Sequence, residues 1–211
     1  MKRNIREEDI ALYVIRCLAI YLLKEEHGIQ VLVNAGIIKE LGLVLSSSNE
    51  KLRKEAIWCL SNITASKPIH VQVVIDSGIL KQIVELTIKD VYTVKVECIW
   101  VLANAAYRHN TSNVKYLIDI DVVEALCSML NIKDLKILYV TIQGILYLLK
   151  GAKEKLDEVK ERIKKCEGLD LLERLQYHEN QYIYRLVYEI IENYFYTKDI
   201  FDDIICSLCI Q

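Results

Sequence analysis

The sequence predicts an all-α, right-handed solenoid of about four to five repeats, each built from three helices. Apolar residues make up 53% of the 211 residues, whereas the chain holds only 7 glycines and 1 proline, a composition typical of helices joined by short turns. Residues 54–62 and 96–104 match each other, with their tryptophans 42 residues apart. Small-residue joints at Gly36 and Gly78 recur at the same spacing. A period near 42 in a helical pattern indicates stacked helical repeats.

Each repeat is expected to hold two short helices and one long helix, which is the armadillo arrangement, whereas HEAT repeats hold two helices. In the second repeat, the short apolar segment 71–75 is followed by Gly78, whose tolerance of positive φ suits the end of a helix. A second amphipathic segment covers residues 79–88, and the long third helix runs from about 92 to 107. Pro68 lies at a joint between helices, where it interrupts nothing.

We therefore expect a single solenoid over residues 1–196, followed by a tail. Its predicted parts are a leading helix at 6–24 and repeats at about 25–66, 67–108, 109–151 and 152–196. Residues 152–165 are rich in charge and are expected to form an exposed helix or an insertion. The tail, residues 197–211, contains an apolar stretch and is a candidate cap for the last repeat, because an open solenoid end exposes its core.

Three residue types recur on one face of two long helices: Glu at i−3, Trp at i and Asn at i+4. The two sets are Glu55, Trp58 and Asn62, and Glu97, Trp100 and Asn104. An indole face can hold the aliphatic stem of Lys or Arg and attract its cationic head. The amide of Asn can both donate to and accept from a peptide backbone, and the carboxylates favour basic segments. The pattern predicts a groove for extended Lys/Arg-rich peptides.

A core position is the alternative interpretation of these tryptophans, because a Trp in a helical repeat is usually buried with its N–H satisfied locally. Two tryptophans in equivalent positions, each followed by Asn at i+4, favour the groove. Asn is mildly unfavourable inside a helix, so propensity does not explain its presence there.

The same residues resemble the importin α family. Residues 53–65 resemble its Trp-x-x-x-Asn repeats, residues 168–195 resemble its last armadillo repeat, and the similarity covers about residues 7–197. The resemblance implies a role in protein transport between cytoplasm and nucleus, without any cofactor. It implies that the two Glu/Trp/Asn sets, together with Ser61 and Arg16, would form the minor site for nuclear localisation signals. It also implies that the last repeats would contribute to binding the export receptor with Ran-GTP.

The sequence departs from the family pattern at several positions. Arg16 and Ile20 stand 42 residues before Trp58 and Asn62. The resemblance implies Arg in the Trp position of this repeat but Asn in the position of Ile20, so one asparagine contact to the peptide backbone is lost. The following repeat has Gln143 and Tyr147 in the equivalent positions. Because no earlier repeats precede the leading helix, we expect the major signal-binding site to be absent. The basic segment at residues 1–6 is too short for importin β, which is not an expected partner.

Several other function classes find little support. A formal charge of −2 does not favour nucleic-acid binding, and no apolar run reaches the 18 or so residues of a membrane span. The four histidines lie in different repeats without metal-ligand spacing, and no Gly-rich phosphate loop is present, so we expect neither a metal site nor an enzyme. His178 belongs to a joint where Asn180 or a neighbour is expected to cap the final helix.

The seven cysteines are far apart and odd in number, which indicates reduced thiols, most of them buried; the Cys206-x-x-Cys209 pair lacks the partners of a zinc site. The rival function is that of a truncated paralogue, serving as a scaffold or decoy that binds transport factors without carrying cargo. The loss of the clamp at Ile20 favours that alternative, and the two intact Trp/Asn pairs oppose it. The apolar leading helix also makes self-association a hypothesis.

Overall fold

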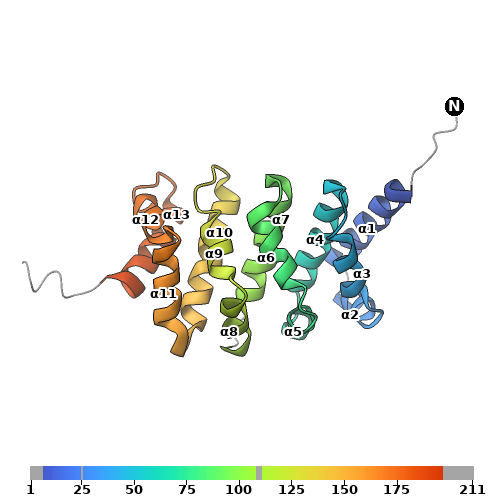
Figure 1. The fold of residues 1–211 in the computed structure, drawn as a ribbon, viewed down its shortest axis with the longest axis horizontal. Coiled ribbons are helices and arrows are strands. Elements are labelled where there is room, and N and C mark those ends of the chain that lie inside the picture. Colours follow the sequence, from blue (N-terminus) through green and yellow to red (C-terminus); the bar gives the residue numbers. More distant parts are fainter. Residues whose placement is uncertain (1–6, 25, 108–110, 197–211) are drawn as a thin grey trace, which may run out of the picture.

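The computed structural model describes residues 7–24, 26–107 and 111–196, and the side chains of residues 24, 26, 27 and 111 are left aside. Within these ranges the chain is helical apart from its turns, and no strand is present. The helices stack in sequence order along one long axis, with α1 (Glu7–Lys24) near one end and α13 (Gln181–Ile190) near the other (Figure 1). This is the all-α solenoid that the sequence predicts. The tail, for which we predicted a cap, lies outside the described residues.

After α1, four units of three helices follow. Their bounds are α2 (Glu26–Asn34), α3 (Ile37–Val44) and α4 (Glu50–Thr64); α5 (Pro68–Asp76), α6 (Leu80–Lys89) and α7 (Tyr92–Tyr107); α8 (Thr111–Asp119), α9 (Val122–Cys127) and α10 (Leu135–Gly151); and α11 (Leu156–Lys165), α12 (Gly168–Leu175) and α13. A 3-10 turn at Lys153–Lys155 precedes α11, and a π-helical turn at Ile191–Phe195 follows α13. The short helices α2, α5 and α8 lie along one edge of the molecule in Figure 1.

The turn between the first and second helix of each unit contains a residue with left-handed backbone conformation. Gly36 and Gly78 adopt φ angles of 85° and 74°, which glycine reaches without strain. Asp121 and Glu167 take the same role in the later units, with φ angles of 65° and 60°. Gly168, which the sequence places at this joint, instead opens α12: a Cβ there would lie 2.6 Å from a buried sulfur atom. This glycine is therefore required by packing.

Asparagine and aspartate side chains begin three of the longer helices. The carboxamide of Asn49 accepts a hydrogen bond from a backbone N–H in the first turn of α4, and Asp134 does the same for α10. Asn180 accepts from the N–H groups of Tyr182 and Ile183, which confirms the predicted cap of the final helix. Pro68 occupies the first turn of α5, where no intrahelical N–H bond is lost.

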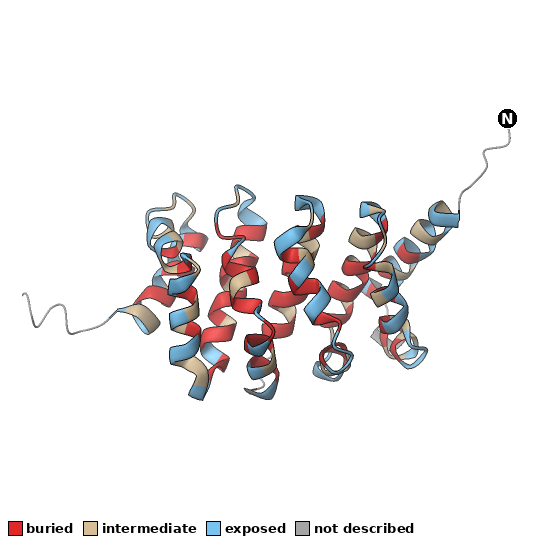
Figure 2. Ribbon diagram, in the orientation of Figure 1, coloured by how far each residue is buried: buried red, intermediate tan, exposed pale blue. Residues whose placement is uncertain are grey.

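The core runs as a continuous band through the stack, and each unit contacts mainly its neighbours (Figure 2). The fully buried large side chains come from several units: Leu41, Ile57, Leu60, Ile63, Leu80, Ile83, Ile99, Leu102, Leu117, Ile118, Leu126 and Leu130. At the first end of the stack, α1 leaves Tyr13 68% and Leu23 60% exposed.

Helix α11 contains most of the charge-rich segment, and it is an integral part of the last unit. Val159 and Ile163 are fully buried on its inner face, so the segment is not an insertion. Arg162 reaches back to the preceding unit, where its guanidinium contacts Glu124 at 2.7 Å and Asp121 at 2.6 Å. The expectation of a solvated face therefore holds for the outer side of the helix only.

The cysteines divide into buried and accessible thiols. Cys59, Cys98 and Cys127 are buried, as predicted, and burial raises the pKa of the Cys59 and Cys98 thiols to about 12. Cys17 is exposed, because among the described residues no unit packs on the outer side of α1. Cys206 and Cys209 lie outside the described residues.

Candidate peptide-binding groove

The two Glu/Trp/Asn sets of α4 and α7, called the ladder below, each hold their asparagine by the same kind of hydrogen bond, one unit apart. Asn62 Nδ2 donates to the carbonyl oxygen of Ala19 in α1 at 3.0 Å, and Asn104 Nδ2 donates to that of Ser61 in α4 at 3.1 Å. Each bond uses one of the two amide N–H groups and fixes the orientation of the side chain. Both side chains stay half-exposed, and within the described part of the chain their Oδ1 atoms accept no hydrogen bond. The asparagines thus link neighbouring long helices, a role that the sequence analysis did not anticipate.

The two tryptophans are half-buried, with one side packed against the core. Trp100 already has a cation over its ring, because Lys136 Nζ lies 5.2 Å from the ring centroid. Lys136 stands in the first turn of α10, where its backbone N–H donates to Asp134 Oδ1 at 2.9 Å. The ring of Trp100 therefore attracts an ammonium group in the peptide-free chain.

The carboxylates of the ladder, Glu55 and Glu97, are partly buried on the same helices as the tryptophans. The Glu55 side chain is 14% exposed; one oxygen lies 4.0 Å from Arg16 Nε, and the other is buried without a hydrogen-bond partner. Burial raises the pKa of the Glu97 carboxyl, and the negative charge of Glu55 adds to that rise, while Lys54 and Lys136 oppose it. Two carboxylates thus lie near each other in a partly desolvated position, with Arg16 close to Glu55, while Lys54 and Lys136 act on Glu97.

The structure places the remaining predicted site residues less favourably. Ser61 is buried and its hydroxyl donates to the carbonyl oxygen of Trp58 at 2.9 Å, so only its backbone takes part in the asparagine link. The side chain of Arg16 is 63% exposed, and it lies near the first Glu/Trp/Asn set because its Nε approaches Glu55. Ile20, in the asparagine position of α1, is 44% exposed and offers no amide.

In α10 of the third unit, Gln143 and Tyr147 stand in the positions that Trp and Asn occupy in α4 and α7. Gln143 donates through Nε2 to the hydroxyl of Tyr139 at 3.0 Å, and the ring of Tyr147 lies 5.0 Å from that of Tyr107. Next to Lys136 lies an open cavity of about 430 Å³ between α10 and α13. It is lined by Leu135, Lys136, Tyr139, Asn180, Tyr182 and Ile183. The sequence analysis did not name Lys136 and Tyr139 as candidate groove residues. Aligning α10 with the long helices α4 and α7 would have placed both residues beside the ladder.

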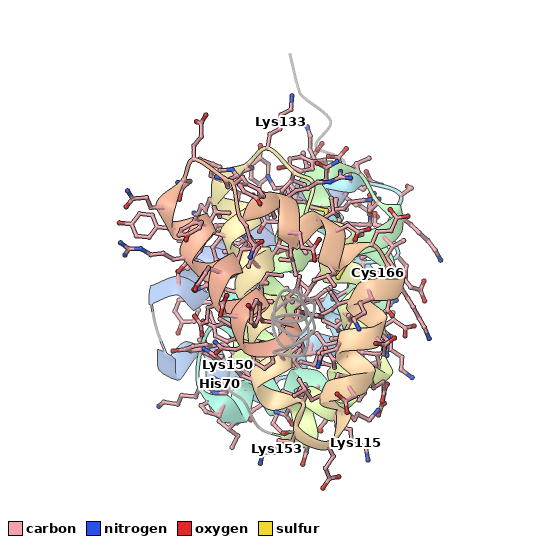
Figure 3. All side chains as sticks on the ribbon, turned by 90° about the vertical axis from the view of Figure 1, so that its left-hand side faces the viewer. His70, Lys115, Lys133, Lys150, Lys153 and Cys166 are labelled. Carbon is pink, nitrogen blue, oxygen red and sulfur yellow. The ribbon has the colours of Figure 1, made fainter. Side chains whose placement is uncertain are left out.

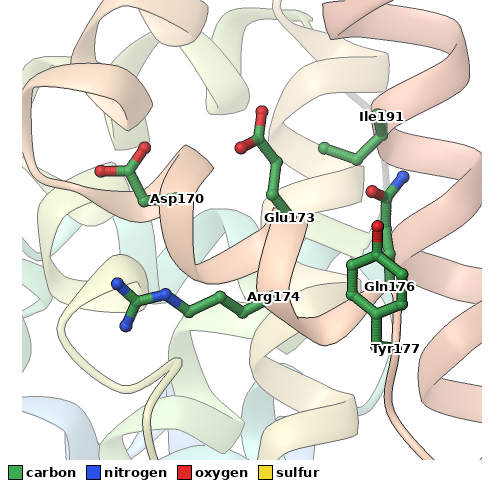
Figure 4. A pocket seen from close by; sticks show the side chains of 6 residues that line it. All are labelled: Asp170, Glu173, Arg174, Gln176, Tyr177 and Ile191. Carbon is green, nitrogen blue, oxygen red and sulfur yellow. The ribbon is translucent and has the colours of Figure 1, made fainter.

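A second hollow lies beside α12 and the turn that follows it (Figure 4). Its lining residues are Asp170, Glu173, Arg174, Gln176, Tyr177 and Ile191. The side chain of Arg174 extends away from Glu173, and the polar groups do not converge on a common point (Figure 4). This arrangement does not resemble a catalytic or ion-binding site.

Other kinds of site find no geometry among the described residues. There, no group of three or more His, Cys, Asp or Glu side chains could hold a metal ion. Lys133 lies at one edge of the molecule and Lys115 and Lys153 lie at the opposite edge, so these lysines form no common basic patch (Figure 3). No single described helix has the length and apolarity to cross a membrane. Helix α10 and the segment after it meet that test only as a pair bent by 110°, and α10 is mostly buried in the core.

Two family models match parts of the chain. Residues 25–65 match the armadillo/beta-catenin-like repeat, and residues 157–205 match the atypical Arm repeat. The first match covers α2 to α4, which include Trp58 and Asn62. Both matches agree with the three-helix units of the structure.

Curated relatives are importin α subunits. The chain is 40% identical over 88 residues to importin subunit alpha-3 of Caenorhabditis elegans, covering 42% of this chain and 17% of that protein. It is 33% identical over 148 residues to importin subunit alpha-5 of Arabidopsis thaliana, covering 68% of this chain and 28% of that protein. The chain thus spans less than a third of these relatives. The matches support an importin α-like armadillo chain.

Solved structures with the same fold are designed armadillo repeat proteins. One of them, solved in complex with the peptide (KR)4, is 25% identical, has a TM-score of 0.74, and aligns over 89% of this chain and 76% of its own. A computationally designed armadillo protein for modular peptide recognition is 24% identical, with a TM-score of 0.79 over the same fractions of the two chains. The chain has an armadillo solenoid fold.

Proposed function

We propose that this importin α-like armadillo solenoid binds Lys/Arg-rich peptide segments, such as nuclear localisation signals, along the groove of α4 and α7. The observation that carries the proposal is the repeated set of Glu, Trp and Asn in the same register of two adjacent long helices, with both amides held in the same orientation. The designed relative in complex with (KR)4 supports this ligand class. By the same proposal, the protein is an adaptor for transport between cytoplasm and nucleus.

The groove supplies three separate contacts to an extended peptide. Each asparagine keeps its Oδ1 and a second N–H for the peptide backbone, because the bond to the neighbouring helix uses only one donor. The exposed side of each indole receives an aliphatic stem or a cationic head. Glu55 and Glu97 attract that charge, because both carboxylates lie beside the tryptophans in a partly desolvated position.

Stacked long helices pack roughly 10 Å apart, which about three residues of extended chain would span. The two Glu/Trp/Asn sets can therefore contact only a few consecutive residues of the peptide. We expect weak binding, roughly micromolar or poorer, which weakens further with added salt because part of the attraction is ionic.

The test is a titration of a labelled Lys/Arg-rich peptide by fluorescence anisotropy, at low and high salt. The wild type is compared with a Trp58→Ala/Trp100→Ala double variant, whose helicity is checked by circular dichroism. Tyr177→Ala is the matched control, because this aromatic side chain is 89% exposed and lies outside the groove. Saturable binding by the wild type and the control, lost in the double variant, supports the proposal. Equal binding by all three proteins, or none by the wild type, contradicts it.

The scaffold or decoy function remains the second candidate, and the exposed Ile20 in place of an asparagine favours it. In that case the groove takes no basic peptide, and the solenoid binds transport factors through other surfaces. This alternative is supported if the wild-type protein does not bind the peptide but is retained by immobilised transport receptors.

A further inference from the structure

The two tryptophan positions of the groove differ in what faces them from the next long helix. Lys136 Nζ lies 5.2 Å from the ring centroid of Trp100. Thr93 occupies in α7 the position that corresponds to Lys136 in α10. Thr93 stands seven residues before Trp100, and Lys136 stands seven residues before Gln143, which is in the Trp position of α10. The hydroxyl of Thr93 donates to Glu50, so this side chain brings no cation to Trp58. The Trp100 position is occupied by the chain itself, whereas the Trp58 position is open.

We propose that Lys136 is an intramolecular competitor that occupies the Trp100 position until a basic peptide side chain displaces it. The inference rests on the proposed function, because it concerns the peptide that the groove would bind. It makes Trp58 the position that a basic residue enters first and Trp100 the position with the weaker apparent affinity.

Lys136 lies in the environment that the proposed function assigns to a peptide lysine. Its ammonium lies over an indole face, and its charge acts on the half-buried Glu97, which carries a neighbouring negative charge in Glu55. The first turn of α10 anchors its backbone, since Lys136 N donates to Asp134. The ammonium is therefore tethered near the ring, at an effective concentration against which a free peptide must compete.

Displacement of Lys136 is nevertheless feasible. The side chain is exposed and its stem is flexible, so the ammonium can move into water when a ligand arrives. An exposed cation–π contact contributes about 0.5–1 kcal/mol, and loss of this contact corresponds to about a two- to fivefold weaker apparent affinity for the ligand. Lys136 therefore reduces the affinity at Trp100 without closing the position.

The chain contains 2 tryptophans, so single-tryptophan variants report each position separately. In Trp58→Phe protein, the emission of Trp100 is followed during titration with an unlabelled Lys/Arg peptide, with and without Lys136→Gln. In Trp100→Phe protein, Trp58 is followed with and without Thr93→Lys, which introduces the competitor at the open position. Lys136→Gln in this second background is the matched control.

We expect Lys136→Gln to tighten binding at Trp100 about two- to fivefold and to leave binding at Trp58 unchanged. Thr93→Lys is expected to weaken binding at Trp58 by a similar factor. Unchanged or weaker binding at Trp100 after Lys136→Gln overturns the inference, because the lysine would then be neutral or part of the peptide site. Such a result leaves the proposed function standing as long as the wild type binds.

A peptide-free measurement tests whether Lys136 occupies the Trp100 ring, even if no variant binds peptide. Cesium ions quench indole fluorescence and compete, as small cations, with Lys136 for access to the ring. In the Trp58→Phe background, Lys136→Gln is expected to raise the quenching constant for cesium, while quenching by neutral acrylamide changes little. An unchanged cesium constant shows that the ammonium does not protect the ring and overturns the inference. A complete lack of peptide binding refutes the proposed function and with it the competitor role, whereas the cesium constants still show whether the ammonium occupies the ring.

Discussion

Replacing Asn104 with alanine separates a structural from a ligand-binding role of this side chain. The substitution removes the 3.1 Å bond from Nδ2 to the carbonyl oxygen of Ser61. That oxygen keeps two donors, the backbone N–H of Ala65 at 2.9 Å and the hydroxyl of Thr64 at 3.0 Å, so no buried acceptor is left unpaired. The lost bond then costs about 0.5–1.5 kcal/mol. Alanine also raises helix propensity by roughly 0.5 kcal/mol, which leaves a net loss of about 0–1 kcal/mol.

The expected effect on peptide binding is larger than that on stability. Asn104→Ala removes both the remaining N–H and the Oδ1 acceptor from the groove, and two lost backbone bonds correspond to about 1–3 kcal/mol, or roughly a 5- to 150-fold weaker affinity. Urea unfolding followed by circular dichroism measures the stability, and anisotropy with the labelled peptide measures the affinity. Asn49→Ala is the control, because it removes the cap of α4 at about 1 kcal/mol without altering the face that carries the tryptophans.

The reasoning is refuted if Asn104→Ala loses more than about 2 kcal/mol of unfolding free energy while its peptide affinity stays within twofold of the wild type. The amide would then serve only to connect α4 and α7. A parallel loss of affinity in Asn49→Ala would show that the affinity follows general stability and not the groove.

Three further outcomes follow from the same contacts. Glu97→Gln is expected to raise the melting temperature, because burial raises the pKa of this carboxyl and its ionisation therefore destabilises the fold as pH rises through that pKa. The same substitution is expected to weaken peptide binding, because it removes a negative charge. For the same reason, the peptide affinity of the wild type should fall on acidification. Asp90→Ala breaks the bidentate pair with Arg53 (2.7 and 2.6 Å) and is expected to cost about 2–4 kcal/mol in urea unfolding. Since Arg53 lowers the pKa of Asp90, the contribution of the pair is present at neutral pH and is lost as pH falls through that lowered value, and Asp90→Ala should show a smaller acid dependence. Gly168→Ala is expected to cost about 1–3 kcal/mol through overpacking, whereas Gly42→Ala, whose Cβ would have no neighbour closer than 3.5 Å, should not destabilise.

The sequence alone predicted most of the helical arrangement, because periodic burial and chain reversal depend on local chemistry. The long helix at residues 92–107 coincides with α7, and the left-handed joint at Gly78 was visible from its composition. The joint at 166–168 was located, but the residue that adopts the left-handed conformation was not. Glu167 takes that conformation because Gly168 is needed for close packing against a sulfur atom of the preceding unit, a contact between distant residues.

The pattern of Trp and Asn at i and i+4 determined which face of α4 and α7 carries the candidate groove, since side-chain direction on a helix follows from its period. Only the tertiary structure decided what else contacts that face: the asparagine bonds to the preceding helix, the buried hydroxyl of Ser61 and the position of Lys136 over Trp100. The asparagine bonds and the contact of Lys136 with Trp100 join residues 43 and 36 positions apart, brought together by the stacking of one unit on the next. Local sequence determines the repeat and its faces, whereas the geometry between repeats determines which groups remain free for a ligand.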